Sequence, residues 1–246
     1  LFIGDEMLWF VSNDMDSVRT KNLYGSAPMG VEVQTLAWAF ERSGTLANTV
    51  FQKHTLINKS AKTIDGMVFG RWADPDLGYA DDDFVGTDTA RDMLYTYNAQ
   101  GRDKEFGDPP ASGIVLLQGP VAPDSNAIAK WNFAARAGWK NLRLTASHFY
   151  YGADAVYADP ELGSPRGAQQ LRNNLTGLVY GGYPIIDPIT QLKTPFVFAG
   201  DPVTHKGWIT ATNFPDADYR SLMATGAVTM APGDTQEVVF AEIVAD

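Results

Sequence analysis

The most regular stretches of the sequence are short and alternate apolar with polar side chains. GVEVQTLAWAF (30–40) and TVFQKHTLINKS (49–60) show this period of two, which is typical of half-buried β-strands. Further segments with strand character cover residues 62–74, 90–99, 113–123 and 141–152, and two more flank the Ala-Pro-Gly-Asp turn at 231–234. A short polar turn joins 49–60 to 62–74, which predicts that these two strands pair as neighbours in a meander.

The number and spacing of these strands predict the fold class. Many short strands separated by turns rich in glycine and proline are typical of β-sandwiches. We therefore predict an all-β fold, an antiparallel β-sandwich of the jelly-roll or immunoglobulin-like type, as a single domain over residues 1–246.

One segment favours a helix instead. In SPRGAQQLRNNLTGLVYGG (164–182), Ser164 can cap the first turn and Pro165 suits the first helical position. Three leucines then recur at spacings of four and three, as on one face of a helix. Residues 126–139 are rich in alanine but also contain a glycine and scattered aromatic residues, so their conformation stays open. We expect one or two short helical insertions.

Composition excludes several classes of protein. A hydrophobic content of 45% is typical of a packed core. The net charge of −10 argues against nucleic-acid binding, and no apolar run is long enough to insert into a membrane. The absence of cysteine excludes disulfides, thiolate zinc sites and cysteine nucleophiles. The chain starts on LFIGDEMLWFVSND, without Met or the features of a signal peptide, so we expect a piece of a longer chain.

The segment WADPDLGYADDDFVG (72–86) concentrates five aspartates without a cationic residue. Calcium prefers six to eight oxygen ligands, which such a loop can supply together with backbone carbonyls. Gly78 and Val85 stand where an EF-hand requires acidic ligands, so a site here would be of an irregular type. A solvated acidic turn and a structural calcium site both remain open. The candidate ligands are Asp74, Asp76, Asp81, Asp82, Asp83 and Asp88.

No catalytic signature stands out. The nucleophile elbow, the P-loop, the zincin motif and the dinucleotide fingerprint are all absent, and the three histidines lie far apart in the sequence. A glycan-active hydrolase would need two carboxylates across a cleft, and 29 acidic residues give no basis for choosing a pair. Exposed aromatic residues could instead form a platform that stacks on sugar rings. The candidates for such a ligand-binding role are Trp72, Tyr79, Tyr150 and Tyr151.

INKSAKTIDGMVFGRWADPDLGYADDDFVGTDTARDMLYTYNA, followed by GPVAP, AGDPVTHKGW and MAPGDTQEVV, resembles a region of long secreted proteins of Bacteroidetes and related bacteria, which often end in a type IX secretion sorting domain. Similar sequences often carry Cys where Thr87 stands here. The resemblance implies an extracellular or cell-surface location and a longer chain, but no activity.

These observations combine into a functional expectation. We expect a non-catalytic structural or adhesive module with an acidic loop ordered by calcium, whose partners would be other copies of the chain or other surface proteins in an extracellular assembly. A carbohydrate-binding module that contacts glycan is the alternative, and a glycan-active hydrolase domain is the third.

Overall fold

The computed structural model describes residues 3–152 and 154–245; residues 1, 2, 153 and 246 of the predicted domain lie outside the described part. Strands make up 47% of the structure and helices 12%. The sheets are antiparallel and form a sandwich, which confirms the predicted all-β fold class.

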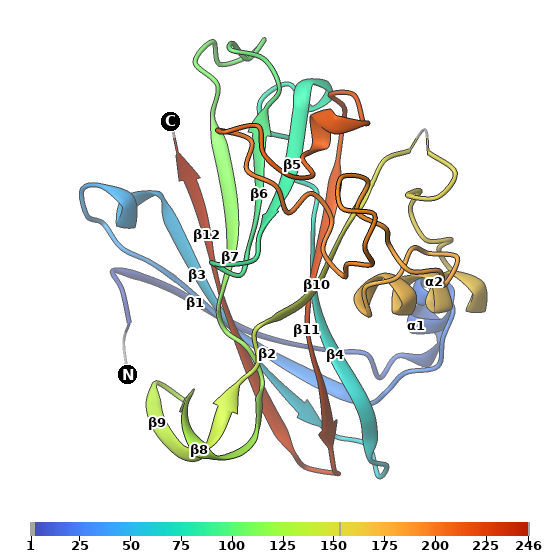
Figure 1. Cartoon of the computed structure of the whole chain (residues 1–246). Coiled ribbons are helices and arrows are strands. Elements are labelled where there is room, and N and C mark those ends of the chain that lie inside the picture. Colours follow the sequence, from blue (N-terminus) through green and yellow to red (C-terminus); the bar gives the residue numbers. More distant parts are fainter. Residues whose placement is uncertain (1–2, 153, 246) are drawn as a thin grey trace.

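The two main sheets differ in width (Figure 1). The larger sheet contains, in spatial order, β1 (Glu6–Asn13), β2 (Val31–Ala39), β3 (Thr49–Asn58), β12 (Thr235–Ala245), β7 (Ala111–Gln118), β6 (Met93–Asn98) and β5 (Asp83–Asp88). The smaller sheet contains β10 (Leu144–Tyr150), β11 (Arg220–Met230) and β4 (Ile64–Ala73). Apolar side chains from both sheets meet in one core, including Leu56 and Phe240 from the larger sheet and Phe69 and Met223 from the smaller.

The predicted meander between the strands at 49–60 and 62–74 is wrong. β3 pairs with β2 and β12, whereas β4 pairs with β11 in the other sheet. Buried Asn58 explains the difference, because its side-chain amide donates to the carbonyls of Lys62 and Met230 and so joins two turns that each cross between the sheets. The polar turn after β3 therefore starts a crossing and not a hairpin.

The undecided segment 126–139 is part of a β-hairpin. β8 (Val121–Trp131) and β9 (Ala134–Asn141) form a separate two-stranded sheet. Asn132 and Phe133 connect them, both with positive φ (47° and 61°), as a tight two-residue hairpin turn requires.

The predicted helix is present as α2 (Pro165–Leu175), and the Ser164 hydroxyl accepts the Gly167 N–H at 3.0 Å. Short 3₁₀ turns occur at η1 (Thr45–Asn48), η2 (Ala80–Asp82) and η3 (Thr210–Thr212). A further helix, α1 (Ser17–Tyr24), was not predicted, since its sequence has no apolar periodicity and only Thr20 is buried. Neither helix of the described residues has the length and apolarity that crossing a membrane requires.

A long connection from β10 to β11 contains α2 and η3. It builds a second, largely aromatic core against the end of the sandwich, in which Phe149, Phe198, Trp208 and Tyr219 pack together. This connection positions the segment immediately before β11 beside the acidic loop.

Candidate cation site

The acidic loop connects β4, at the edge of the smaller sheet, with β5, at the edge of the larger sheet. Two other segments meet it at the same end of the molecule, the upper end in Figure 1: the β6–β7 loop and the segment before β11. The Tyr79 N–H donates to Asp103 Oδ2 at 3.1 Å, and the Ala217 N–H donates to the Asp83 carbonyl at 3.2 Å. Three segments that are distant in the sequence thus converge here.

Three carboxylates are buried at this convergence. Asp82 is 0% exposed, and Asp83 and Asp103 are each 2% exposed. Asn98 lies among them: its amide nitrogen donates to Asp82 Oδ1 and, at 3.3 Å, to Asp103 Oδ2. Among the described residues, none of the three carboxylates forms an ion pair.

Asp103 is well satisfied by backbone donors. Its Oδ1 accepts the N–H groups of Glu105 and Phe106, and the Tyr79 N–H donates to its Oδ2. The hydrogen bond from Phe106, with those from Tyr79 and Glu105, lowers the pKa of Asp103. This close approach also explains Gly78, whose φ is +64° and where a Cβ would lie 2.4 Å from Asp103 Oδ2.

Asp82 and Asp83 are not fully satisfied. Asp83 Oδ2 accepts the Leu77 N–H at 3.0 Å, but Asp83 Oδ1 and Asp82 Oδ2 are buried and accept no hydrogen bond from the described residues. Burial, opposed by the Leu77 hydrogen bond and reinforced by the negative charges of Asp82, Asp103 and Asp76, raises the pKa of Asp83 to about 7. An unpaired buried carboxylate oxygen is costly, and a proton or a cation would relieve it.

A second acidic group lies at the surface of the same end. One carboxylate oxygen from each of Asp74, Asp76 and Asp218 lies within 4.8 Å of the others. Arg220 borders this group through ion pairs with Asp159 at 3.2 Å and Asp218 at 3.6 Å, so part of the negative charge is already compensated. Burial, together with the charges of Asp76 and Asp218, raises the pKa of Asp74.

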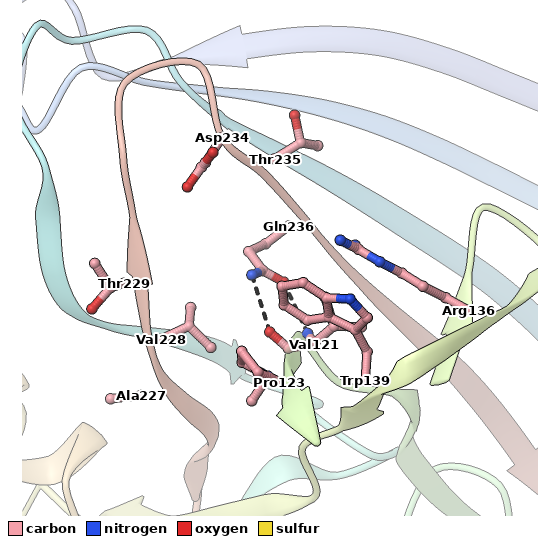
Figure 2. A pocket seen from close by; sticks show the side chains of 11 residues that line it. Val121, Pro123, Arg136, Trp139, Ala227, Val228, Thr229, Asp234, Thr235 and Gln236 are labelled. Carbon is pink, nitrogen blue, oxygen red and sulfur yellow. Dashed lines mark hydrogen bonds between the residues drawn. The ribbon is translucent and has the colours of Figure 1, made fainter. Parts of the chain in front are cut away.

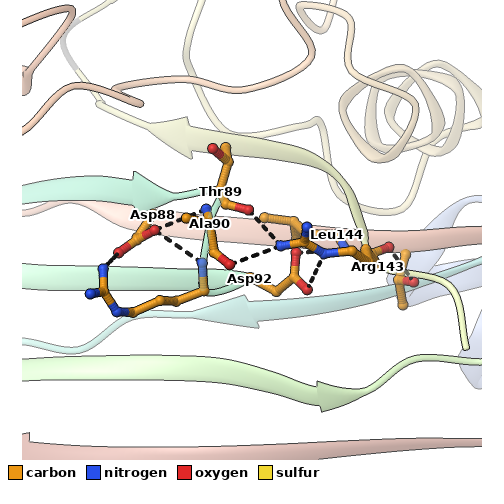
Figure 3. Close-up of polar contacts among 8 residues, drawn as sticks. Asp88, Thr89, Ala90, Asp92, Arg143 and Leu144 are labelled. Atoms are coloured by element: carbon orange, nitrogen blue, oxygen red, sulfur yellow. Dashed lines mark hydrogen bonds and ion pairs between the residues drawn. The ribbon is translucent and has the colours of Figure 1, made fainter.

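The six predicted ligands do not form one site. Asp74 and Asp76 belong to the surface group, Asp82 and Asp83 to the buried group, and Asp81 is exposed. Asp88 lies at the opposite end of β5, where it accepts the backbone N–H groups of Ala90 and Arg91 and pairs with the Arg91 guanidinium (Figure 3). The Asp88 carboxylate caps the turn that follows β5, at the end of the strand remote from the acidic loop. Asp88 therefore cannot share a site with the other predicted ligands.

Sequence reasoning also missed members of both groups. Asp103 and Asn98 come from the β6–β7 region and Asp218 from the segment before β11. No local pattern distinguishes these residues from other acidic or amide residues, since their proximity to the acidic loop arises only from the sheet topology.

The four predicted ligand-binding aromatics do not form a platform. Trp72 is exposed on β4, and the Tyr79 ring is covered by the Lys104 ammonium at 3.7 Å from its centroid. Tyr150 is completely buried, which corrects its predicted role, because its hydroxyl donates to Asn174 inside the protein and its ring is closed to surface ligands. Tyr151 packs against the aromatic core near Tyr219.

A separate pocket of about 390 Å³ lies between the β8–β9 hairpin and the β11–β12 turn (Figure 2). Trp139 and Arg136 line it, and the Arg136 guanidinium covers the indole at 3.9 Å from its ring centroid. The Gln236 side chain bonds both the N–H and the carbonyl of Val121. This pocket is amphipathic, and Gln236 is the lining side chain that pairs within it.

Neither a protein-family model nor a curated protein sequence matches the chain. The fold and the site define the structural class of the protein. It is an antiparallel β-sandwich with a buried acidic cluster where its two sheets meet at one end.

Proposed function

We propose that the chain is a non-catalytic structural or adhesive module of a secreted or cell-surface bacterial protein, and that calcium orders its acidic end. One observation carries the proposal: Asp82 and Asp83, consecutive in the chain, are both buried, and each has a carboxylate oxygen that accepts no hydrogen bond from the described residues. The extracellular setting rests on the resemblance of the acidic segment to secreted bacterial proteins.

The donor set favours calcium over softer metals. The groups available are carboxylate and carbonyl oxygens, without a histidine or cysteine in the cluster, and hard cations prefer such ligands. Calcium accepts irregular coordination and completes its shell with backbone carbonyls or water, whereas magnesium demands near-octahedral geometry. A cation here would neutralise charges from segments belonging to both sheets, which is a structural role.

Thermal unfolding in excess EDTA and in millimolar calcium tests the proposal. We expect a melting temperature several degrees higher in calcium, since a ligand at 100 times its Kd stabilises the folded state by about 2.7 kcal/mol. Asp82→Asn and Asp83→Asn should each remove the calcium effect. Asp88→Asn is the matched control, because it makes the same charge change on the same strand outside the cluster, and it should keep the full calcium effect. Identical melting in EDTA and calcium would exclude a calcium-ordered module.

The surface group is distinguished from the buried group by its own variants. Asp76→Asn and Asp218→Asn should leave most of the calcium effect if the ion binds at Asp82 and Asp83. Loss of the effect in these variants alone would place the ion at the surface group instead.

A carbohydrate-binding module is the second candidate function. It is supported by the exposed indole of Trp72 and by Trp139 at the pocket of Figure 2. Affinity electrophoresis against soluble polysaccharides tests it: retardation that Trp72→Ala or Trp139→Ala abolishes would support glycan binding. Unchanged mobility with every polysaccharide would count against it.

A further inference from the structure

The first strand of the larger sheet leaves four consecutive large apolar side chains in solvent. Leu8, Trp9, Phe10 and Val11 are each 44–61% exposed, and they are uncharged. Successive residues of a strand point to opposite faces, so both faces of β1 are open here. A long apolar edge strand of this kind is what soluble proteins normally avoid or cover.

The backbone of β1 also has a free side. In the described residues β1 pairs only with β2, at the end of the sheet order. The Asp14 N–H donates to the Val31 carbonyl opposite it, so within the continuous register of β1 the even-numbered residues direct their backbone groups toward β2. It follows that Met7, Trp9 and Val11 direct their N–H and C=O groups to the open edge.

The other edge of the same sheet is covered. The Thr87 N–H of β5 donates to the Phe198 carbonyl, and the Ala217 N–H donates to the Asp83 carbonyl. The Val85 N–H likewise donates to the Thr210 hydroxyl. The long β10–β11 connection thus occupies outward backbone groups of β5, so within the described residues β1 is the edge of the larger sheet that is left to accept another strand.

We propose that a second copy of this chain covers β1, through antiparallel pairing of β1 with itself about a two-fold axis at Trp9. In this register Met7 lies opposite Val11 of the other copy and Leu8 opposite Phe10, so each apolar side chain meets another on the same face of the joined sheet. The outward backbone groups of the two Trp9 residues then form a hydrogen-bonded pair.

The charges of the strand also fit this arrangement. The antiparallel register places Glu6, the one acidic residue of β1, opposite the neutral Ser12 of the other copy. Parallel pairing would instead place Glu6 beside Glu6 of the other copy, in a chain whose net charge is already −10. The two-fold contact uses the β1 edge of both copies, and the β5 edge at the other side of the larger sheet is covered, so pairing through this sheet closes at a dimer. The interface does not involve the cation site, so we expect it in EDTA as well as in calcium.

Sedimentation velocity of the full chain over a concentration series measures the dimer. We expect Trp9→Lys, which brings two ammonium groups together at the axis, to weaken dimerisation at least tenfold. Val203→Lys is the matched control, since Val203 is an exposed apolar residue away from β1, and it should dimerise like the native chain. Far-UV circular dichroism establishes that both variants fold. A native chain that stays monomeric at every concentration, or a dimer that Trp9→Lys leaves intact, would overturn the proposal.

Cysteine cross-linking tests the register and does not depend on the lysine variant folding. The chain contains no cysteine, so Trp9→Cys introduces a single thiol at the two-fold axis. Directly opposite residues of a hydrogen-bonded antiparallel pair have Cα atoms about 5.5 Å apart, within the range that a disulfide bridges. Ser12→Cys places the two thiols roughly 20 Å apart along the paired strands. In a glutathione redox buffer, Trp9→Cys should form covalent dimer much faster than Ser12→Cys, and equal rates would contradict this register.

Discussion

Two buried titratable residues give direct tests of how the stability of the fold depends on pH. The Asp83 carboxyl and the His148 imidazole are both inside the protein, but burial shifts their pKa values in opposite directions. Burial raises the pKa of a carboxyl and lowers that of an imidazole, because it disfavours the charged form of each. The two groups therefore make opposite contributions to the pH dependence of stability.

Asp83 should make the calcium-free protein less stable as pH rises. Its pKa is about 7 in the folded state and near 3.8 in the unfolded chain, so the folded state holds an extra proton between these values. The stabilisation is fully present below pH 4 and is lost as pH rises through 7. Melting in EDTA from pH 4 to 8 measures it: the native chain should lose stability relative to Asp83→Asn over this window. Parallel curves for the two proteins would show that Asp83 is ionised throughout.

His148 should make the protein less stable as pH falls. Burial lowers its pKa to about 3, and both ring nitrogens lack a partner among the described residues. The unfolded chain binds a proton at this imidazole near pH 6.5, whereas the folded state binds it only near pH 3. The free energy of unfolding therefore declines by roughly 4 kcal/mol as pH falls from 6.5 to 3. Chemical unfolding of His148→Leu should show a shallower decline over this range than the native chain. A decline of equal steepness would show that other groups control acid unfolding.

At the scale of elements, local signals predicted α2 and most strands of the two main sheets, but not β1 or β5, and not which strands pair. β3 and β4 each show the predicted alternation of apolar and polar residues. Nothing in the turn between them indicates that the chain changes sheets there, because Asn58 acts through contacts with a turn more than 170 residues later. α1 has a capping aspartate, Asp16, and a left-handed glycine, Gly25, at its ends. Those signals surround only eight residues without apolar periodicity, so the helix was missed.

The cap of α2 provides a test at this scale. Ser164→Ala removes the side-chain acceptor of the Gly167 N–H, and an N-cap loss of this type costs about 1 kcal/mol. For a domain of this size we expect the melting temperature to fall by about 2–4 °C. Ser43→Ala, at an exposed serine outside any helix, should leave it unchanged. Equal melting of the two variants would mean that packing of α2 alone holds its first turn.

At the scale of the whole molecule, the acidic cluster lies where the two sheets come together. Asp82 and Asp83 were predictable as candidate ligands because five aspartates stand close together in one loop. Asp103 and Asp218 were not, because the β6–β7 loop and the segment before β11 reach the acidic loop only after both sheets have formed. A cation at this position would join segments from both sheets and reduce their independent opening.

Hydrogen exchange measured by mass spectrometry tests this role of the cluster. Calcium should slow exchange together in residues 74–82, 99–110 and 213–219, since a bound ion would resist local opening of all three segments. The β8–β9 hairpin lies at the opposite end of the molecule (Figure 1) and should exchange at the same rate in calcium and EDTA. Asp83→Asn should show no calcium effect in any of the three segments. Slowing confined to 74–82 would mean that the ion orders the loop without joining the sheets, and slowing in the hairpin alone would place it elsewhere.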